Sequence, residues 1–149
     1  MTSIIPPAVA QALATGTVAE VLTATLAHFD CQAGTVHRVK EELLQLVASA
    51  NIPPPVVQLV QTVPIGKGIA GLAAERREPI TLCNLQTDTS GQARPAARQT
   101  GMEGSLAVPM LVAGELRGVL GIAKANAYDW PAQETALLMA IGAELSARI

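Results

Sequence analysis

The fold is decided by two apolar runs that flank a short turn: SLAVPMLV (Ser105–Val112), AGE (Ala113–Glu115) and LRGVLGIA (Leu116–Ala123). Two apolar runs of strand length around a short glycine-containing turn are typical of an antiparallel β-hairpin. We therefore predict that these two segments pair in antiparallel fashion as the central pair of a sheet. The remaining segments must supply the other strands and the helices that cover them.

Shorter strand-like and helical segments precede this hairpin. The runs Thr35–Val39 and Leu43–Ser49 predict a second hairpin, and Ile80–Asn84 predicts a short strand. Gly68–Arg77 has the apolar spacing of a helix, whereas Val56–Val63 fits either a short helix or an extended segment. Because strands do not alternate regularly with helices, the order disfavours a doubly wound parallel sheet. A mixed or antiparallel sheet with helices on its faces fits better.

Helices are predicted at both ends of the chain. Residues 1–14 form an N-terminal helical extension, in which Pro6 and Pro7 can open a short helix that runs through Ala14. The run TVAE (Thr17–Glu20) has the capping-box pattern, a hydroxyl at the N-cap and a carboxylate three residues later, and begins the next helix. A last helix is expected to be capped by Asp129, with Pro131 in its first turn.

Length and composition limit the classes of function. A chain of 149 residues suits one domain, here 1–149, and 50% hydrophobic with 15% charged residues excludes intrinsic disorder. Aromatic residues make up only 2%, too few for a platform on which nucleic-acid bases stack. The net charge of -2 supplies no positive field for a phosphate backbone. We expect no nucleic-acid partner.

The cysteines and the N-terminus indicate a cytoplasmic protein. Cys31 and Cys83 lie far apart, which fits neither a disulfide-dense secreted scaffold nor a CxxC site. The first basic residue is Arg38, so no positively charged region precedes the early apolar stretch as it would in a signal peptide. No apolar run reaches 18 residues, so we expect no membrane partner. His28 and His37 form no zinc-ligand spacing with the cysteines, so no metal site is predicted.

One glycine-rich motif admits two interpretations. GKGIAG (Gly66–Gly71) matches the G-x-G-x-x-G pattern of dinucleotide-binding loops, and Asp88 follows at about the expected 20 residues. Pro64, however, interrupts the strand that should feed such a loop, and a hairpin rather than further βαβ units follows. The favoured alternative is that these glycines permit a tight loop and close packing of a helix.

A long polar segment, residues 86–104, separates the short strand from the main hairpin. Arg94 and Arg98 are four residues apart and share a face if the segment is helical, and paired guanidinium groups suit a carboxylate or phosphate. Together with Cys83, Glu103 and Ser105 they are the candidate ligand-binding residues, expected to border one cavity. The alternative is a solvated loop that carries surface charge.

Three stretches in this order resemble the GAF domain family over nearly the whole chain, about residues 15 to 149. The first stretch is VPIGKGIAGLAA (Val63–Ala74) followed by EPI (Glu78–Ile80). The second is SLAVPM (Ser105–Met110) followed by GEL (Gly114–Leu116) and GVLGI (Gly118–Ile122). The third is YDWPAQE (Tyr128–Glu134) with Leu137 and Leu138.

The resemblance implies an α+β fold. A central antiparallel sheet of five or six strands would carry the terminal helices on one face and a ligand pocket on the other. Family members are mostly sensory modules for ligands such as cyclic nucleotides, tetrapyrroles, 2-oxoglutarate or amino acids, and they often dimerise through their terminal helices. The signatures of the cyclic-nucleotide and bilin binders are missing here. A few members reduce free methionine sulfoxide with several pocket cysteines, for which this chain offers only Cys83.

We therefore predict a non-enzymatic sensory module for a small ligand of anionic character, acting through a partner or output domain. The ligand and any cofactor are left unassigned. Two alternatives stay open: a small redox enzyme that uses Cys83, and a purely structural dimerisation domain. A homodimer through the terminal helices is expected, because Ala136, Met139, Ala140, Ala143 and Ala147 leave the outer faces of the last helix small and apolar.

Overall fold

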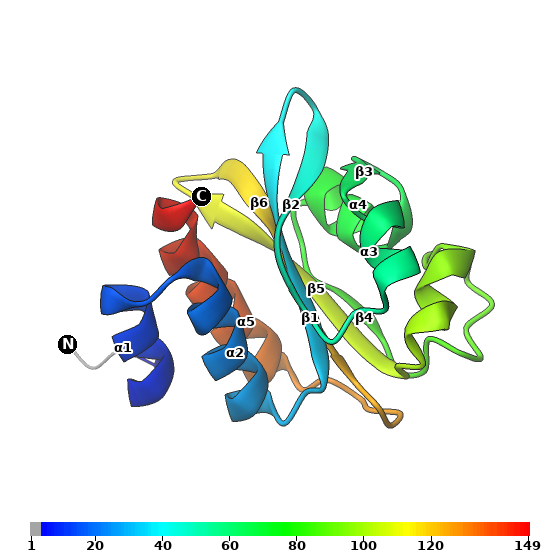
Figure 1. The fold of residues 1–149 in the computed structure, drawn as a ribbon, viewed down its shortest axis with the longest axis horizontal. Coiled ribbons are helices and arrows are strands. Elements are labelled where there is room, and N and C mark those ends of the chain that lie inside the picture. The colour runs from blue at the N-terminus through cyan, green and yellow to red at the C-terminus, as the bar shows by residue number, and fades with distance from the viewer. Residues whose placement is uncertain (1–3) are drawn as a thin grey trace.

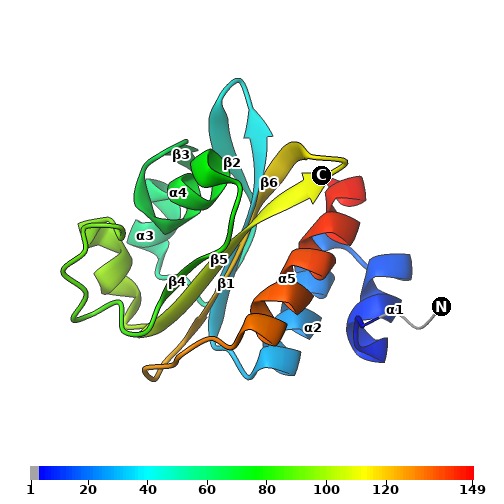
Figure 2. The same cartoon turned by 180° about the vertical axis from the view of Figure 1, so that it is seen from behind.

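The computed structural model describes residues 4–149, apart from the side chain of Ala96. A six-stranded sheet with the order β3-β2-β1-β6-β5-β4 lies between two groups of helices (Figures 1 and 2). Every neighbouring pair of strands is antiparallel. The strands are β1 (Ala33–Lys40), β2 (Leu43–Ala50), β3 (Thr62–Pro64), β4 (Ile80–Leu82), β5 (Gly104–Val112) and β6 (Glu115–Lys124). The predicted α+β class with an antiparallel sheet is confirmed.

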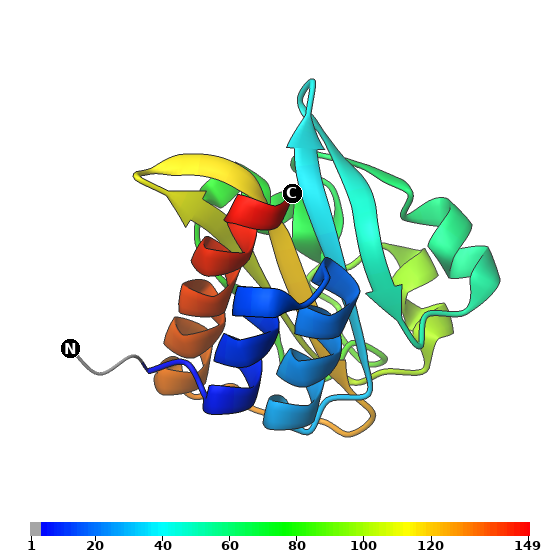
Figure 3. The same cartoon turned by 60° about the vertical axis from the view of Figure 1, so that its left-hand side comes forward.

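The terminal helices cover one face of the sheet, as predicted (Figure 3). They are α1 (Pro7–Thr15), α2 (Val18–Phe29) and α5 (Ala132–Leu145), which a short 3₁₀ turn, η2 (Ser146–Arg148), extends. The other face carries α3 (Pro54–Leu59), α4 (Gly68–Arg76) and the 3₁₀ helix η1 (Pro95–Thr100). No helix of the described residues 4–149 is long and apolar enough to cross a membrane.

The hairpin predicted from the apolar runs is present, but it is not the central pair. Strands β5 and β6 pair with a register shift between Met110 and Leu111. The middle of the sheet is instead the β1–β6 pair, because β1 also pairs with β2 on its other side. Strand β5 is thereby second from the edge, with only the three-residue β4 outside it.

Two further predictions needed correction near prolines. The segment Val56–Val63, for which helix and strand were alternatives, holds the end of α3 and then the start of β3. The last helix begins at Ala132 with Pro131 at the N-cap, and no side chain caps it. Asp129 lies too early to cap, and its carboxylate instead accepts a hydrogen bond from the Cys83 thiol.

The alternation of side chains along β1 gives the two faces of the sheet different characters. Val36 belongs to the core between the sheet and the terminal helices. At Gly34 a Cβ atom would lie 3.0 Å from side-chain carbons of both Leu22 and Leu26, so the missing side chain lets α2 approach closely. The alternate residues point the other way, toward α3, α4 and η1.

The helical extension predicted over residues 1–14 is docked rather than free, although residues 1–3 lie outside the described residues. Val9 is fully buried in the core on the helix side of the sheet. Arg148, after α5, donates hydrogen bonds to the carbonyls of Leu13 and Gly16. Helix α1 therefore lies against both α2 and α5 (Figure 3) and covers part of their outer surface. The capping box at Thr17 is present as predicted.

Candidate functional site

Two adjoining cavities open on the face of the sheet opposite the terminal helices. The His37 cavity, about 140 Å³, is lined by Thr35, His37, Leu59, Val60, Val63, Lys67, Gly68, Ile69, Ala70, Arg94 and Ala97. The Ser105 cavity, about 130 Å³, shares Thr35, Ile69, Ala70 and Ala97 with the first. Its other lining residues are Ala33, Gly34, Ile52, Leu85, Thr100, Met102, Ser105, Leu106, Ala107, Gly121, Ile122 and Ala123. Each is close to the size of a cavity that holds one benzene ring.

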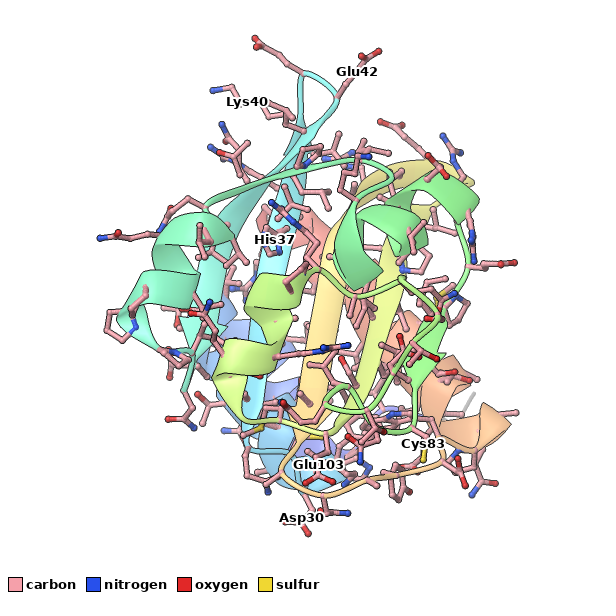
Figure 4. The ribbon with its side chains drawn as sticks, turned by 90° about the vertical axis from the view of Figure 1, so that its right-hand side faces the viewer. Asp30, His37, Lys40, Glu42, Cys83 and Glu103 are labelled. Carbon is pink, nitrogen blue, oxygen red and sulfur yellow. The ribbon has the colours of Figure 1, made fainter. Side chains whose placement is uncertain are left out.

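Strand β1 supplies the floor of the His37 cavity. Figure 4 shows His37 in the hollow beneath α3, α4 and η1. The His37 side chain is only 2% exposed, and its Nε2 lies 2.8 Å from the Val60 carbonyl oxygen. Because a carbonyl oxygen only accepts, Nε2 carries the hydrogen and Nδ1 carries the lone pair. Nδ1 has no hydrogen-bond partner among the described residues. Burial lowers the pKa of His37, which keeps the imidazole neutral.

The glycine-rich motif forms a tight loop at the start of α4 and one wall of the His37 cavity. The Gly66 amide donates to the Gly71 carbonyl over 2.8 Å, and the Lys67 amide donates to the Pro64 carbonyl over 3.1 Å. The strand that feeds this loop, β3, is a three-residue antiparallel edge strand. A dinucleotide fold needs a parallel strand there, so the structure supports the tight-loop interpretation.

Arg94 reaches the same wall from the polar segment. A Cβ atom on Gly68, whose φ is +69°, would lie 3.1 Å from Cγ and Cδ of Arg94. The missing side chain therefore lets the Arg94 alkyl chain lie on the first turn of α4. Lys67 is the N-cap residue of that helix, and no side chain caps the free amides of its first turn. Two cations and a helix N-terminus thus meet at one cavity.

The polar side chains that line the cavities are two cations, the neutral imidazole of His37 and three hydroxyl groups. Lys67 and Arg94 are the charged lining residues, and Thr35, Thr100 and Ser105 add hydroxyl groups. Among the described residues that line either cavity there is no aspartate, glutamate or cysteine. The described residues also hold no group of three His, Cys, Asp or Glu side chains placed to bind a metal ion.

The structure does not bring the five candidate ligand-binding residues to one cavity. Arg94 lines the His37 cavity and Ser105 lines the Ser105 cavity, whereas Cys83, Arg98 and Glu103 line neither. Arg98 is exposed and donates to the Asp88 carbonyl over 2.8 Å, because η1 turns its side chain back onto the polar segment. Glu103 accepts a hydrogen bond from Asn84 over 3.2 Å. Figure 4 shows Cys83 and Glu103 at the opposite end of this face from His37.

The two cysteines are free thiols of different kinds. Cys83 is exposed, and the hydrogen bond to Asp129 raises its pKa. Cys31 is half-buried, and desolvation raises its pKa to about 11. Both therefore remain protonated near neutral pH, whereas a nucleophilic cysteine acts as the thiolate.

Four polar lining residues are not among the ligand contacts predicted from the sequence: Thr35, His37, Lys67 and Thr100. The signal for the first two is their even spacing in a strand, which places both side chains on one face. Lys67 was seen only as a variable position of the glycine motif. Its role in the cavity depends on Arg94, which is distant in the sequence.

The sequence profile of the GAF domain matches residues 12–149. The chain belongs to the GAF domain family. GAF domains are in general sensory modules that bind small molecules. No curated protein matches the chain.

Solved structures with the same fold include a GAF domain and methionine sulfoxide reductases. The GAF domain of a phosphoenolpyruvate-protein phosphotransferase from Coxiella burnetii has 22% identity and a TM-score of 0.77, over 94% of this chain and 87% of that one. Free methionine-R-sulfoxide reductase from Neisseria meningitidis, solved with its substrate, has 14% identity and a TM-score of 0.75, over 99% and 93%. Staphylococcus aureus fRMsr, in its reduced form, has 19% identity and a TM-score of 0.69, over 99% of both chains. At these identities the likeness shows the fold alone.

The buried His37 predicts a specific dependence of stability on pH. Its pKa in the folded state lies below the unfolded value of 6.5, so below that pH the unfolded chain binds a proton that the folded chain does not. The His37 contribution is therefore intact above the unfolded pKa and is lost as the pH falls through the folded pKa. Urea unfolding from about pH 7 to about pH 5 should show a steeper loss of stability for the parent chain than for His37→Gln.

His28 provides the control, since it is exposed on α2. His28→Gln should keep the steeper dependence of the parent chain. Parallel pH curves for the parent chain and His37→Gln would contradict the prediction.

Proposed function

We propose that this GAF domain is a non-enzymatic sensory module that binds a small molecule in the joined His37 and Ser105 cavities. The observation that carries the proposal is the lining: two adjoining apolar cavities with a few convergent polar groups and no cysteine or carboxylate among the described lining residues. A largely apolar pocket with a small number of placed polar groups is what a small-molecule site requires. Of the residues singled out in the sequence, Arg94 and Ser105 are included in this site.

The output of the module is proposed to lie in a partner or an attached domain. The unpaired thiols of Cys31 and Cys83 suit the reducing environment of the cytoplasm. We therefore place the module there.

Native mass spectrometry tests the binding proposal, because it reports bound ligand without requiring its identity beforehand. Protein purified under gentle conditions should carry a non-covalent small molecule. Ala97 lines both cavities, so Ala97→Phe should fill them and abolish the adduct. Gln99→Phe adds the same side chain to an exposed position of η1 that lines neither cavity, and should keep it.

One set of results would contradict the binding proposal. If no adduct is found in any of the three proteins and Ala97→Phe raises the unfolding temperature, the cavities are packing voids. The alternative of a purely structural dimerisation domain would then be favoured.

The redox alternative rests on the fold likeness to free methionine-R-sulfoxide reductases and on the exposed thiol of Cys83. Two features weigh against it: Cys83 lines neither cavity, and its pKa is raised. With dithiothreitol as reductant, the parent chain should therefore reduce free methionine-R-sulfoxide no faster than Cys83→Ser. Turnover that disappears in Cys83→Ser would establish the enzyme and end the sensory proposal.

We further propose a homodimer through the terminal helices. Helix α1 covers part of the surface of α2 and α5, so the interface must use what α1 leaves open. On α5 this includes the exposed Ala136 and the partly exposed Met139, Ala140 and Ala143. Small apolar side chains of this kind allow a second helix to approach closely, as in a four-helix bundle.

Sedimentation of substituted chains tests the dimer. Ala140→Glu should convert it to a 15.4 kDa monomer, because it places an unpaired charge between the helices. Gln58→Glu adds the same charge at an exposed position of α3, on the opposite face of the sheet, and should leave the dimer intact. A parent chain that sediments as a monomer at high concentration would refute the proposal.

A further inference from the structure

The charge around the cavities is one-sided. Lys67 and Arg94 have exposed side chains, and neither forms a hydrogen bond or ion pair through its charged group with a described residue. The lining contains no acidic group to balance them. Glu75, which lies close to Gly66 beside the same loop, lines neither cavity. The chain as a whole carries a net charge of -2, so the positive charge at the cavities is opposite in sign to the net charge of the protein.

Two interactions would stabilise an anion placed between Lys67 and Arg94. The guanidinium and ammonium groups offer charge-assisted hydrogen bonds, which are stronger than those between neutral groups. The uncapped first turn of α4 points the positive end of the helix dipole to the same place. A carboxylate is an anion of suitable size, since each cavity holds little more than one ring.

The same lining disfavours an ammonium group. A zwitterionic amino acid would bring its positive charge next to Lys67 and Arg94. The described lining offers that charge the neutral Nδ1 of His37 and hydroxyl oxygens, but no carboxylate. Like charges in a partly desolvated site repel, and an unpaired buried charge is costly. We therefore expect this lining to favour carboxylates without an ammonium group over those that carry one.

The rest of the ligand meets apolar surface. The Ser105 cavity is lined mainly by apolar residues, and those outside the helix-side core include Ile52, Ile69, Leu85, Met102 and Ala107. The hydroxyl groups of Thr35, Thr100 and Ser105 are the described polar side chains there. A compact hydrocarbon body gains free energy from burial against such a lining.

We propose that the joined cavities bind a small apolar monocarboxylate without an ammonium group, its carboxylate held by Lys67 and Arg94 and its apolar body in the Ser105 cavity. This ligand class rests on the proposed function and makes it specific. It also sets this chain apart from an amino-acid-binding relative of the same fold.

Titration with a matched set of phenyl compounds tests the ligand class. Phenylacetate is the probe, and phenylacetamide, phenylglycine and phenyl phosphate change only the charged end. Chemical shifts of the backbone amides of Thr35, Gly68 and Ile69 report binding in the cavities. We expect phenylacetate to bind there at least about ten-fold more tightly than the other three, the usual effect of one charged hydrogen bond.

Charge-removing variants identify the groups that hold the carboxylate. Lys67→Gln and Arg94→Gln keep much of the side-chain length and should each weaken phenylacetate binding about ten-fold. Lys40→Gln and Arg76→Gln are the matched controls, since each removes one exposed positive charge that lines neither cavity. Both controls should bind phenylacetate within about two-fold of the parent chain, because exposed charges at a distance are screened by salt.

The outcomes separate the ligand class from the function itself. If phenylacetamide or phenylglycine matches phenylacetate at the same amides, the cavities bind small molecules but the class is wrong. Tighter binding of phenyl phosphate overturns it in favour of a phosphate. The monocarboxylate class is also overturned if no probe shifts these amides at millimolar concentration, or if phenylacetate shifts only amides near Arg38 and Arg117. Native mass spectrometry then still decides whether the protein binds a small molecule of another class.

Discussion

The antiparallel pairing of β1 with β6 in the middle of the sheet is the constraint on which both faces of the molecule depend. In this register Val36 lies opposite Leu120 and His37 lies opposite Val119. Side chains alternate along a strand, so one register sends Val36 into the helix-side core and His37 into the cavity. A slip by one residue would bury His37 under the helices and expose Val36 to the cavity. The core and the candidate site are therefore specified by the same set of backbone hydrogen bonds.

The end of β6 is tied to the terminal helices by a buried lysine. Lys124 is 7% exposed, and its ammonium group donates to the carbonyl oxygens of Phe29 and Asp30 at the end of α2. The same group lies 4.6 Å from the centroid of the Tyr128 ring, a cation–π distance. A cation at a helix C-terminus complements the helix dipole. Ala123, the preceding residue, lines the Ser105 cavity, so the strand that borders this cavity is fixed directly to the helices behind it.

Local sequence patterns predicted most of the fold, because the interactions that define its elements are local. The capping box at Thr17, the glycine turn at Gly114 and the alternation of apolar residues each involve neighbours in the chain. The middle of the sheet was missed, since it depends on pairing between β1 and β6, whose sequence separation no periodicity reveals. The start of the last helix was misplaced for a local reason: Pro131 takes the N-cap position, and Asp129 lies two residues before it.

The sequence predicted only part of the candidate site, because the contacts that bring its residues together join distant parts of the chain. Arg94 and Ser105 were predicted because they lie in or beside the long polar segment. The same criterion also selected Arg98, which donates to the Asp88 carbonyl, and Glu103, which accepts a hydrogen bond from Asn84. What distinguishes Arg94 is the contact of its alkyl chain with the first turn of α4, where Gly68 leaves room. That contact brings Arg94 beside Lys67 and concentrates positive charge at a cavity in a chain of net negative charge. The chemistry of the site thus arises from one glycine and two cations that come together only in the folded chain.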